Sequence, residues 1–173
     1  NAALAEYNKG ERVYDYLWNR KYSEDGIFRV KFWLKDRFVH VNVDDRFPCT
    51  QYSYSNAPNI HYYRPWTTQR SSQHAWWVPV VEKAYSKLNQ NYDRIIGGWG
   101  DEAMRSLTGL PTQQLHYSMK PEARGLMLRN FGIVKSWADK NYPMTSACFH
   151  SHYGLVSGHA YALLGAAELK NSA

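Results

Sequence analysis

The chain has 173 residues, is 44% hydrophobic and 16% aromatic, and carries a formal net charge of +6. This composition argues against intrinsic disorder, and no apolar run is long enough to span a membrane. The two cysteines are too few for a disulfide framework and fit a reducing compartment, so we expect a cytoplasmic protein.

The basic residues are spread along the chain and form no continuous block. In the segment 61–66, tyrosines and a tryptophan alternate with histidine and arginine, a mixture that can stack on bases or sugars. An ordinary basic surface over buried aromatic side chains explains the same composition, and we favour it. We therefore expect no nucleic-acid partner.

Two helices and a hairpin are predicted in the first 50 residues. Small residues and helix formers at positions 1–7 predict a helix already under way, so we expect residues upstream of Asn1. Apolar pairs four residues apart predict a second helix over 11–22. Apolar residues then alternate along 27–34 and again from Phe38, which predicts a β-hairpin over 27–43.

Asp44 and Asp45 directly follow the predicted hairpin. Two adjacent carboxylates can bind a metal ion, or they can act as an acid and a base. The simpler interpretation is that one carboxylate pairs with Arg46 and the other caps a turn, and we favour it.

The middle of the chain combines an irregular stretch with the most strongly patterned helix. Residues 51–73 are polar, aromatic and without periodicity, which indicates an insertion. Apolar residues at helical spacing from Trp77 to Leu88 predict an amphipathic helix whose apolar face belongs to the core. Further helices are predicted over 101–107 and 121–141.

Three glycines, Gly97, Gly98 and Gly100, follow the amphipathic helix. They do not form the phosphate-binding pattern, which needs a lysine and a serine or threonine at fixed spacing. They can present backbone groups to an extended peptide, or they can form a plain turn. The residues alone leave both alternatives open.

A candidate catalytic histidine lies near the C-terminus. Residues 144–150 predict a strand, and a second strand is expected from Val156, with His159 on it. Gly158 removes side-chain bulk beside His159, so that another backbone can approach it closely. A histidine on a rigid strand suits proton transfer, although a lone histidine is more often a core or hydrogen-bonded residue. Both interpretations stay open on the residues alone.

Cys148 allows two further interpretations. Cys148, His150 and His152 would share one face of a strand, which makes a zinc site conceivable, without an obvious fourth ligand. Cys148 and His159 could form a catalytic dyad. A cysteine within a strand lacks the helix N-terminus that commonly activates a catalytic thiol, so we do not expect the dyad. Because the fourth ligand is missing, we also predict no metal in this chain.

Six blocks of the chain, in this order and spacing, carry the motifs of one protein family. They are residues 26–33, 41–48, 77–88, 97–98, 107–109 and 154–166. Together they resemble the calpains, the papain-like intracellular cysteine endopeptidases. The last block, G-L-V-S-G-H-A-Y-A-L-L-G-A, resembles the segment of that family that contains the catalytic histidine.

The resemblance implies an α+β, papain-like fold with two lobes. The helical lobe would comprise residues 1–99, with the hairpin 27–43, and the strand-rich lobe would comprise residues 100–173. A protein or peptide substrate would lie extended in the cleft between them. His159 would be catalytic, and the backbones of Gly98 and Gly158 would bind the substrate. For the full-length protein, the resemblance also implies further domains and allows calcium binding.

The chain departs from the family pattern at three places. The family's nucleophile motif, C-W-x-x-A-A, would place its alanines at Ala2 and Ala3, so its cysteine would precede Asn1. The asparagine of the catalytic triad would follow Ala173, and Ala75 replaces an acidic calcium ligand. We therefore predict that this chain alone is inactive and binds no cofactor. The alternative is a catalytically dead calpain-like module that binds peptides or partner proteins.

Overall fold

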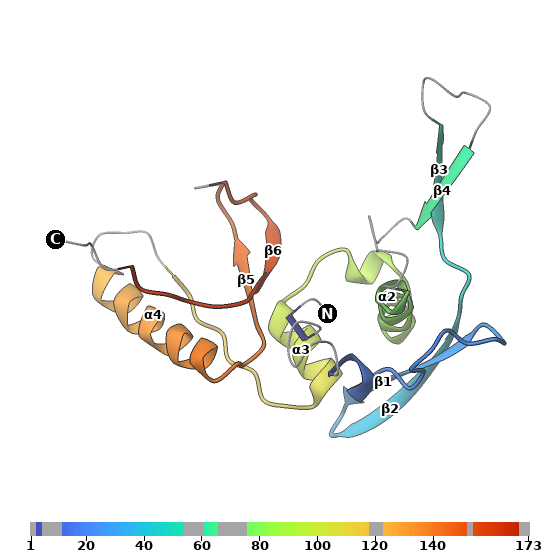
Figure 1. The fold of residues 1–173 in the computed structure, drawn as a ribbon, viewed down its shortest axis with the longest axis horizontal. Helices are drawn as coiled ribbons and strands as arrows, with labels where there is room; N and C mark the ends of the chain where they lie inside the picture. The colour runs from blue at the N-terminus through green and yellow to red at the C-terminus, as the bar shows by residue number, and fades with distance from the viewer. Residues whose placement is uncertain are drawn as a thin grey trace. The chain divides into compact units, whose positions relative to one another are not determined.

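The computed structural model describes residues 3–4, 12–53, 61–65, 76–117, 123–151 and 154–169. The described part of the chain contains four strands, then a run of helices, then two strands, so the prediction of an α+β fold is confirmed (Figure 1). The named elements are β1 (Ile27–Leu34), β2 (Arg37–Asp44), β3 (Cys49–Ser53), β4 (His61–Pro65), α2 (Trp77–Leu88), η2 (Asp93–Ile95), α3 (Gly100–Thr108), α4 (Arg124–Asp139), β5 (Met144–Cys148) and β6 (His159–Leu163).

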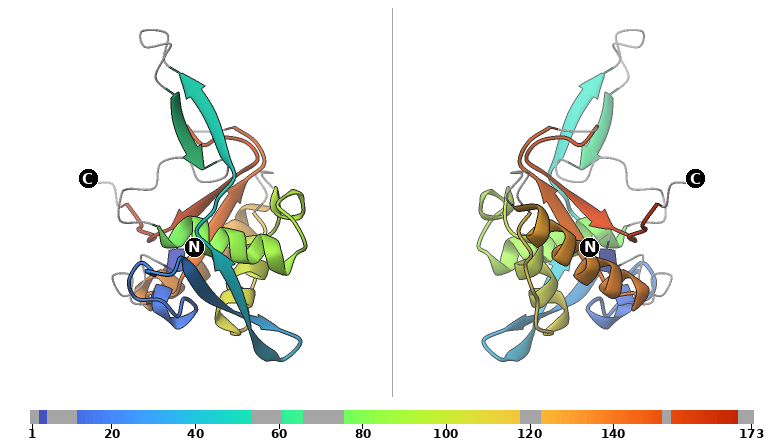
Figure 2. Two further views of the ribbon diagram at one scale, coloured as in Figure 1. Left: turned by 90° about the vertical axis from the view of Figure 1, so that its right-hand side faces the viewer. Right: turned by 90° about the vertical axis from the view of Figure 1, so that its left-hand side faces the viewer.

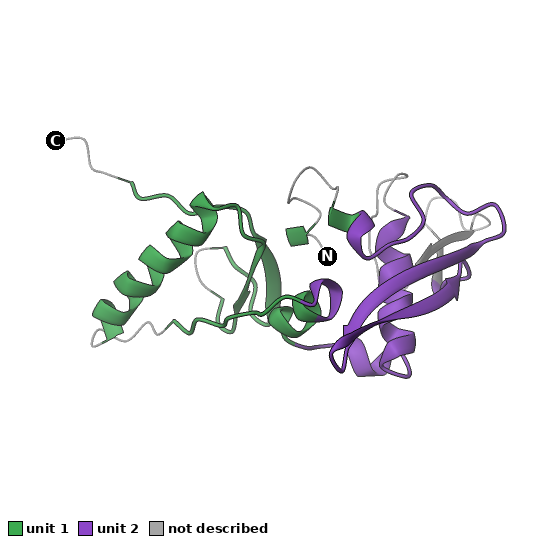
Figure 3. Cartoon of the chain, turned by 90° about the horizontal axis from the view of Figure 1, so that it is seen from below, with its two compact units in different colours: residues 1–13, 99–105, 110–173 green, residues 14–98, 106–109 purple. Residues whose placement is uncertain are grey.

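The chain divides into two compact units, coloured separately in Figure 3. Unit 2 comprises residues 14–98 and 106–109, and unit 1 comprises residues 1–13, 99–105 and 110–173. The lobe boundaries that we inferred from the family resemblance, 1–99 and 100–173, stay predictions.

Unit 2 is built on the predicted hairpin, which is confirmed. Strands β1 and β2 are antiparallel, with Ile27 opposite Asp44 and Leu34 opposite Arg37. The two residues between the strands, Lys35 and Asp36, both have positive φ, at 48° and 59°. Two left-handed residues in a two-residue loop match the right-handed twist of the strands, so the chain reverses there without disturbing the register.

Helix α2 covers the apolar face of this hairpin, and it occupies the residues predicted for it. Alternation puts a row of side chains from both strands on that face, and α2 adds its own apolar stripe. The rings of Phe32 and Tyr85 lie 5.8 Å apart between strand and helix. The buried residues of this core are Phe28, Val30, Phe32, Val41, Val43, Val80, Val81 and Ala84.

The predicted helix over 11–22 is wrong for most of its length. Only residues 12–15 form a helical turn, of the 3₁₀ type, and Leu17 then pairs with Val30 in an antiparallel bridge. The Lys31 N–H donates to the Tyr16 carbonyl at 2.7 Å, and Tyr16 and Leu17 are almost fully buried. Pairing with the edge of β1 buries these two side chains in succession, and this tertiary contact overrides the local helical pattern.

The stretch 51–73 is not irregular where the structure describes it. Strands β3 and β4 pair antiparallel, from Cys49 opposite Pro65 to Ser53 opposite His61, and form a ribbon of two strands (Figures 1 and 2). The other residues of that stretch lie outside the described part of the chain. The same is true of most of the predicted N-terminal helix, of which only Ala3 and Leu4 are described, as helical and buried.

Unit 1 contains helix α4 and the β5–β6 hairpin, and α3 crosses from unit 1 into unit 2. The helices predicted over 101–107 and 121–141 correspond to α3 and α4, although residues 118–122 are not described. Helix α3 ends at Thr108, and the next residue, Gly109, has φ +72° and lies against the Trp33 and Phe38 rings within unit 2. None of the described helices is long and apolar enough to cross a membrane.

Candidate functional site

The candidate histidine lies at the first position of strand β6. Strands β5 and β6 are antiparallel, with Cys148 opposite His159 and Met144 opposite Leu163. The strand that we expected from Val156 begins three residues later, because the chain turns at Gly158. There φ is +68°, and the Gly158 N–H donates to the Cys148 carbonyl at 2.7 Å.

The structure adds a second reason for a glycine at position 158. A Cβ atom built at Gly158 would meet no atom within 4 Å, so no neighbouring group requires the space. The left-handed backbone is what favours glycine here, since it is strained for residues that carry a Cβ. Gly158 therefore sets the direction in which the chain enters β6, one residue before the histidine.

The loop before His159 is closed by side chains as well as backbone. The Ser157 hydroxyl donates to the Phe149 carbonyl at 2.7 Å, and the Ser157 N–H donates to the Ser151 hydroxyl at 3.2 Å. The Val156 N–H donates to the Tyr161 hydroxyl oxygen at 2.8 Å. These three bonds connect residues 156 and 157, at the end of the loop, to Phe149 and Ser151 at its beginning and to Tyr161 on β6.

His159 itself is exposed, which excludes the interpretation as a core histidine. Its ring lies 4.9 Å from the Tyr161 ring, with an interplanar angle of 74°. Imidazole is the side chain most often used for general acid–base catalysis, and an exposed ring on a strand is accessible to a reacting group. The site can therefore transfer protons to and from a molecule bound beside β6.

Cys148 is the cross-strand neighbour of His159. Directly opposed residues of an antiparallel pair have side chains on the same face, with Cβ atoms about 4.5–5.5 Å apart. The Cys148 thiol is half-exposed and donates to the His150 carbonyl at 2.6 Å.

The zinc interpretation depended on Cys148, His150 and His152, of which His152 lies outside the described residues. Within the described part of the chain, no group of three or more His, Cys, Asp and Glu side chains is placed to hold a metal ion.

Gly98 lies in unit 2, whereas Gly158 and His159 lie next to each other in unit 1. Gly98 is exposed, and a Cβ atom at Gly98 or at the preceding Gly97 would meet nothing within 4 Å. Neither glycine has a positive φ. The backbone at Gly98 is thus open to approach, and its conformation does not itself require glycine.

Asp44 and Asp45 have separate partners. Lys83 of α2 forms an ion pair with the Asp44 carboxylate, whose Oδ1 also accepts the Arg46 N–H at 2.8 Å. The bond from Lys83 is the main cause of a lowered pKa at Asp44. Asp45 accepts the Tyr22 hydroxyl at 2.9 Å, which raises the pKa of that tyrosine. The ion-pair partner of Asp44 is thus Lys83 rather than Arg46. Asp44 also caps the turn, which we expected of the other carboxylate, and Asp45 instead accepts from Tyr22.

Sequence reasoning assigned no role to Tyr161, Ser157 or Lys83, all of which hold parts of these sites in place. For Tyr161 a signal was present, because residues two apart on a strand lie on the same face. Lys83 is separated from Asp44 by 39 positions and follows no local pattern.

Comparison with known proteins supplies the family. The family model described as calpain family cysteine protease matches residues 2–173. The chain is 27% identical to "Calpain-type cysteine protease ADL1" of Oryza sativa over 97% of its own length and 8% of that protein. It is 27% identical to "Calpain-5" of Caenorhabditis elegans over 86% of its length and 23% of that protein, and 30% identical to "Calpain-12" of Homo sapiens over 81% and 18%.

The chain therefore spans less than a quarter of the length of these curated relatives. The family model, in contrast, covers nearly every residue of the chain. Both findings agree with the ordered motifs in the sequence, and the chain belongs to the calpain family of cysteine proteases.

Proposed function

We propose that this chain is part of the core of a calpain-type cysteine endopeptidase and that His159 is its catalytic histidine. The observation that carries the proposal is the exposed imidazole at the start of β6, held by the Gly158 turn within the segment that resembles the family's histidine motif. Exposure and a rigid backbone are what a general base needs, because it must meet a substrate in one orientation.

In the proposed reaction, a cysteine thiol gives its proton to His159, and the thiolate attacks the carbonyl carbon of a peptide bond. The histidine then returns a proton to the leaving amine, and water hydrolyses the resulting thioester. The substrate would lie extended in a cleft between two lobes, paired with the backbones of Gly98 and Gly158. Such pairing recognises the main chain, so any extended protein segment can bind.

Neither cysteine of this chain lies in the family's C-W motif. Cys49 begins β3 after a proline, and Cys148 shares a hairpin with His159 while its thiol bonds to the His150 carbonyl. We therefore propose that the nucleophile comes from outside these 173 residues and that this chain alone cleaves no peptide bond. Further domains and a cytoplasmic location belong to the same proposal.

The test uses an unfolded protein substrate, with a thiol reductant present. The 173-residue chain should show no turnover above that of its His159→Ala variant. A longer product of the same gene, with C-W upstream and N-P-W downstream, should cleave the substrate and lose its activity with His159→Ala. Turnover by the short chain that disappears with His159→Ala and with Cys148→Ser would instead show a dyad within this hairpin. Peptide binding without cleavage by the longer product would identify a non-catalytic module.

The role of Gly98 gives a prediction with an internal control. Valine at Gly98 should weaken binding of a peptidyl inhibitor to the longer product by at least tenfold, because its side chain would stand where the inhibitor's backbone must approach. Gly97→Val is the matched control, since a Cβ atom meets nothing at either position. Both variants should keep the wild-type thermal midpoint. Equal inhibitor affinity in all three proteins would refute the assignment of Gly98.

The described residues of unit 2 do not fit a calcium site. Calcium takes six to eight oxygen ligands, supplied largely by carboxylates. Asp44 is paired with Lys83, and Asp45 accepts a hydrogen bond from Tyr22, so neither carboxylate is available without losing its partner. We predict no binding of calcium by the 173-residue chain at micromolar concentration in isothermal titration calorimetry. A binding isotherm that Asp44→Asn or Asp45→Asn abolishes would contradict this.

A further inference from the structure

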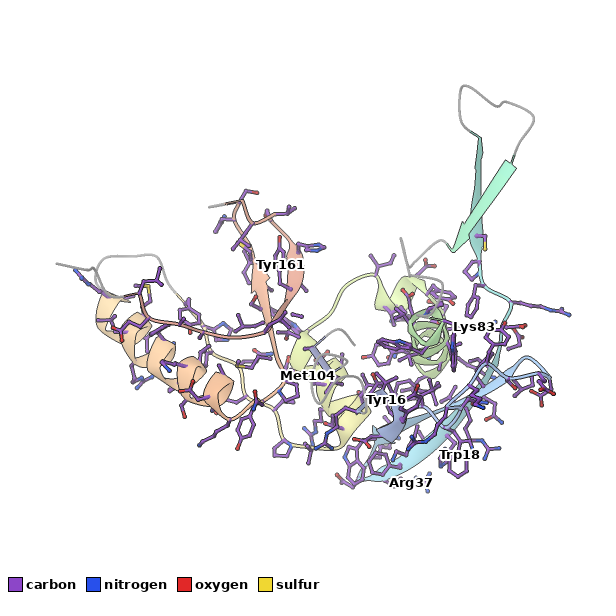
Figure 4. The ribbon with its side chains drawn as sticks, viewed as in Figure 1. Tyr16, Trp18, Arg37, Lys83, Met104 and Tyr161 are labelled. Carbon is purple, nitrogen blue, oxygen red and sulfur yellow. The ribbon has the colours of Figure 1, made fainter. Side chains whose placement is uncertain are left out.

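We propose that Tyr161 is a positioning residue for His159, acting through both its ring and its hydroxyl. The inference rests on the proposed catalytic role of His159 and adds a residue whose function neither the motifs nor the comparisons assign. Tyr161 lies on β6, two positions after the histidine (Figure 4).

The ring of Tyr161 limits where the imidazole can turn. The two ring centroids are 4.9 Å apart and the planes are nearly perpendicular, at 74°. This edge-to-face arrangement is the favoured one for aromatic pairs, and it is lost if either ring rotates away. An exposed histidine would otherwise sample several side-chain orientations, so contact with Tyr161 favours one of them.

The hydroxyl of Tyr161 acts on the backbone before the histidine. It accepts the Val156 N–H at 2.8 Å, three residues before His159. Between these two points lies Gly158, whose left-handed conformation fixes the entry to β6. The Tyr161 side chain thus contacts the imidazole directly and also bonds to the backbone of the turn before it. It therefore constrains both the ring and the backbone of His159.

This double contact predicts that the two parts of Tyr161 can be separated by substitution. Phenylalanine keeps the ring and removes the bond to Val156, whereas leucine removes both. Tyr142→Leu is the matched control, because Tyr142 is an exposed tyrosine of unit 1 for which no contact with the histidine is described.

The first measurement is NMR on the 173-residue chain, which needs no catalytic activity. Wild type and Tyr161→Phe should show nuclear Overhauser cross-peaks between the rings of residues 159 and 161. In Tyr161→Leu, the His159 ring protons should move to the chemical shifts of an unstructured histidine, and in Tyr142→Leu they should not move. Faster exchange of the Val156 amide is expected in both Tyr161 variants. Absent cross-peaks in wild type, or unchanged His159 shifts in Tyr161→Leu, would overturn the proposal.

The second measurement is kinetic and uses the longer product that contains the cysteine and asparagine motifs. Tyr161→Leu should lower kcat on the order of ten- to a hundredfold with KM changed less than twofold, since misorientation of a catalytic group acts mainly on the chemical step. Tyr161→Phe, which keeps the ring, should retain most of the wild-type kcat. A normal kcat in Tyr161→Leu would overturn the positioning role. Full activity in His159→Ala would instead refute the proposed function. The NMR measurement needs no activity, so its result would still decide whether Tyr161 orients the His159 ring.

Discussion

Lys83 shows how one side chain can fix several parts of unit 2. Its ammonium group pairs with the Asp44 carboxylate and donates to the Asp44 carbonyl at 3.3 Å and to the Arg46 carbonyl (Figure 4). It also lies 5.5 Å from the centre of the Phe47 ring. Lys83 thereby connects helix α2 to the end of β2 and to the residues that follow it.

The pairing of Asp44 with Lys83 predicts a dependence of stability on acid. The pKa of the Asp44 carboxyl is lowered in the folded chain, so the folded state binds this proton less readily than the unfolded state. The stabilisation is therefore complete above the unfolded pKa of about 3.9, and it is lost as pH falls through the lower, folded pKa. Asp44→Asn should lower the urea midpoint at pH 7, and its difference from wild type should shrink on acidification towards pH 2.

Lys83→Met provides the control for this prediction. It removes the main cause of the lowered pKa and leaves the smaller contribution of the Arg46 N–H. Adding Asp44→Asn to it should therefore produce a smaller dependence on pH between 2 and 5 than adding it to the wild type. A difference between wild type and Asp44→Asn that is the same at pH 7 and at low pH would contradict the assignment.

At the level of single residues, the sequence predicted His159 and Gly158 because both belong to one short motif. It did not predict the pairing of Asp44 with Lys83 or of Asp45 with Tyr22. Those contacts depend on how a helix and a loop pack against the hairpin, which a local pattern does not contain. Gly158 also illustrates the limit of a motif, which includes the glycine but does not reveal the backbone conformation that favours it.

Among the elements, the β1–β2 hairpin contains the clearest local backbone strain, which lies in its turn. Lys35 and Asp36 both have positive φ in its turn, a conformation that glycine adopts at no cost and that aspartate tolerates better than most residues. The sequence predicted the turn but not its strained type, because neither residue is the glycine or asparagine usual for such a loop.

Asp36→Gly should therefore stabilise the protein by about 1 kcal/mol, which corresponds to a rise of about 2–4 °C in the thermal midpoint. Asp36→Ala is the control and should lower the midpoint, since alanine carries a Cβ and lacks the polar side chain that helps aspartate adopt positive φ. Calorimetry of the three proteins measures both effects. A lower midpoint for the glycine variant would show that the turn does not have this conformation in solution.

The sequence predicted well those elements whose single apolar face packs against one neighbouring element. Strands β1 and β2 and helix α2 have one apolar face each, and these faces meet. The segment 11–22 also has helical spacing, but Tyr16 and Leu17 are buried by pairing with β1 instead. Strands β3 and β4 were missed because their sequence does not alternate.

Across the whole molecule, burial is distributed unevenly between the units. The largest fully buried side chains of the described residues, Tyr16, Leu17, Phe28, Val30, Phe32, Val80 and Val81, all belong to unit 2. In unit 1, Phe149 is 63% exposed, Val156 61% and Leu164 70%. Burial of apolar surface is the dominant stabilising contribution in folding, and among the described residues the candidate histidine lies in the unit with less of it.

This difference predicts two levels of protection in native-state hydrogen exchange. Amides of β1 and β2 should exchange only through global unfolding of unit 2, whereas those of β5 and β6 should exchange through a smaller opening with a lower free energy. Mass spectrometry of the exchanging chain in low concentrations of urea separates the two, because a global opening depends steeply on urea and a local one does not.

Phe28→Ala, which should destabilise unit 2 by about 3–5 kcal/mol, is the diagnostic variant. It should speed up exchange in β1 and β2 while that in β5 and β6 stays nearly unchanged. Equal protection of both hairpins in the wild type, or an equal response to Phe28→Ala, would mean that the two units unfold as one.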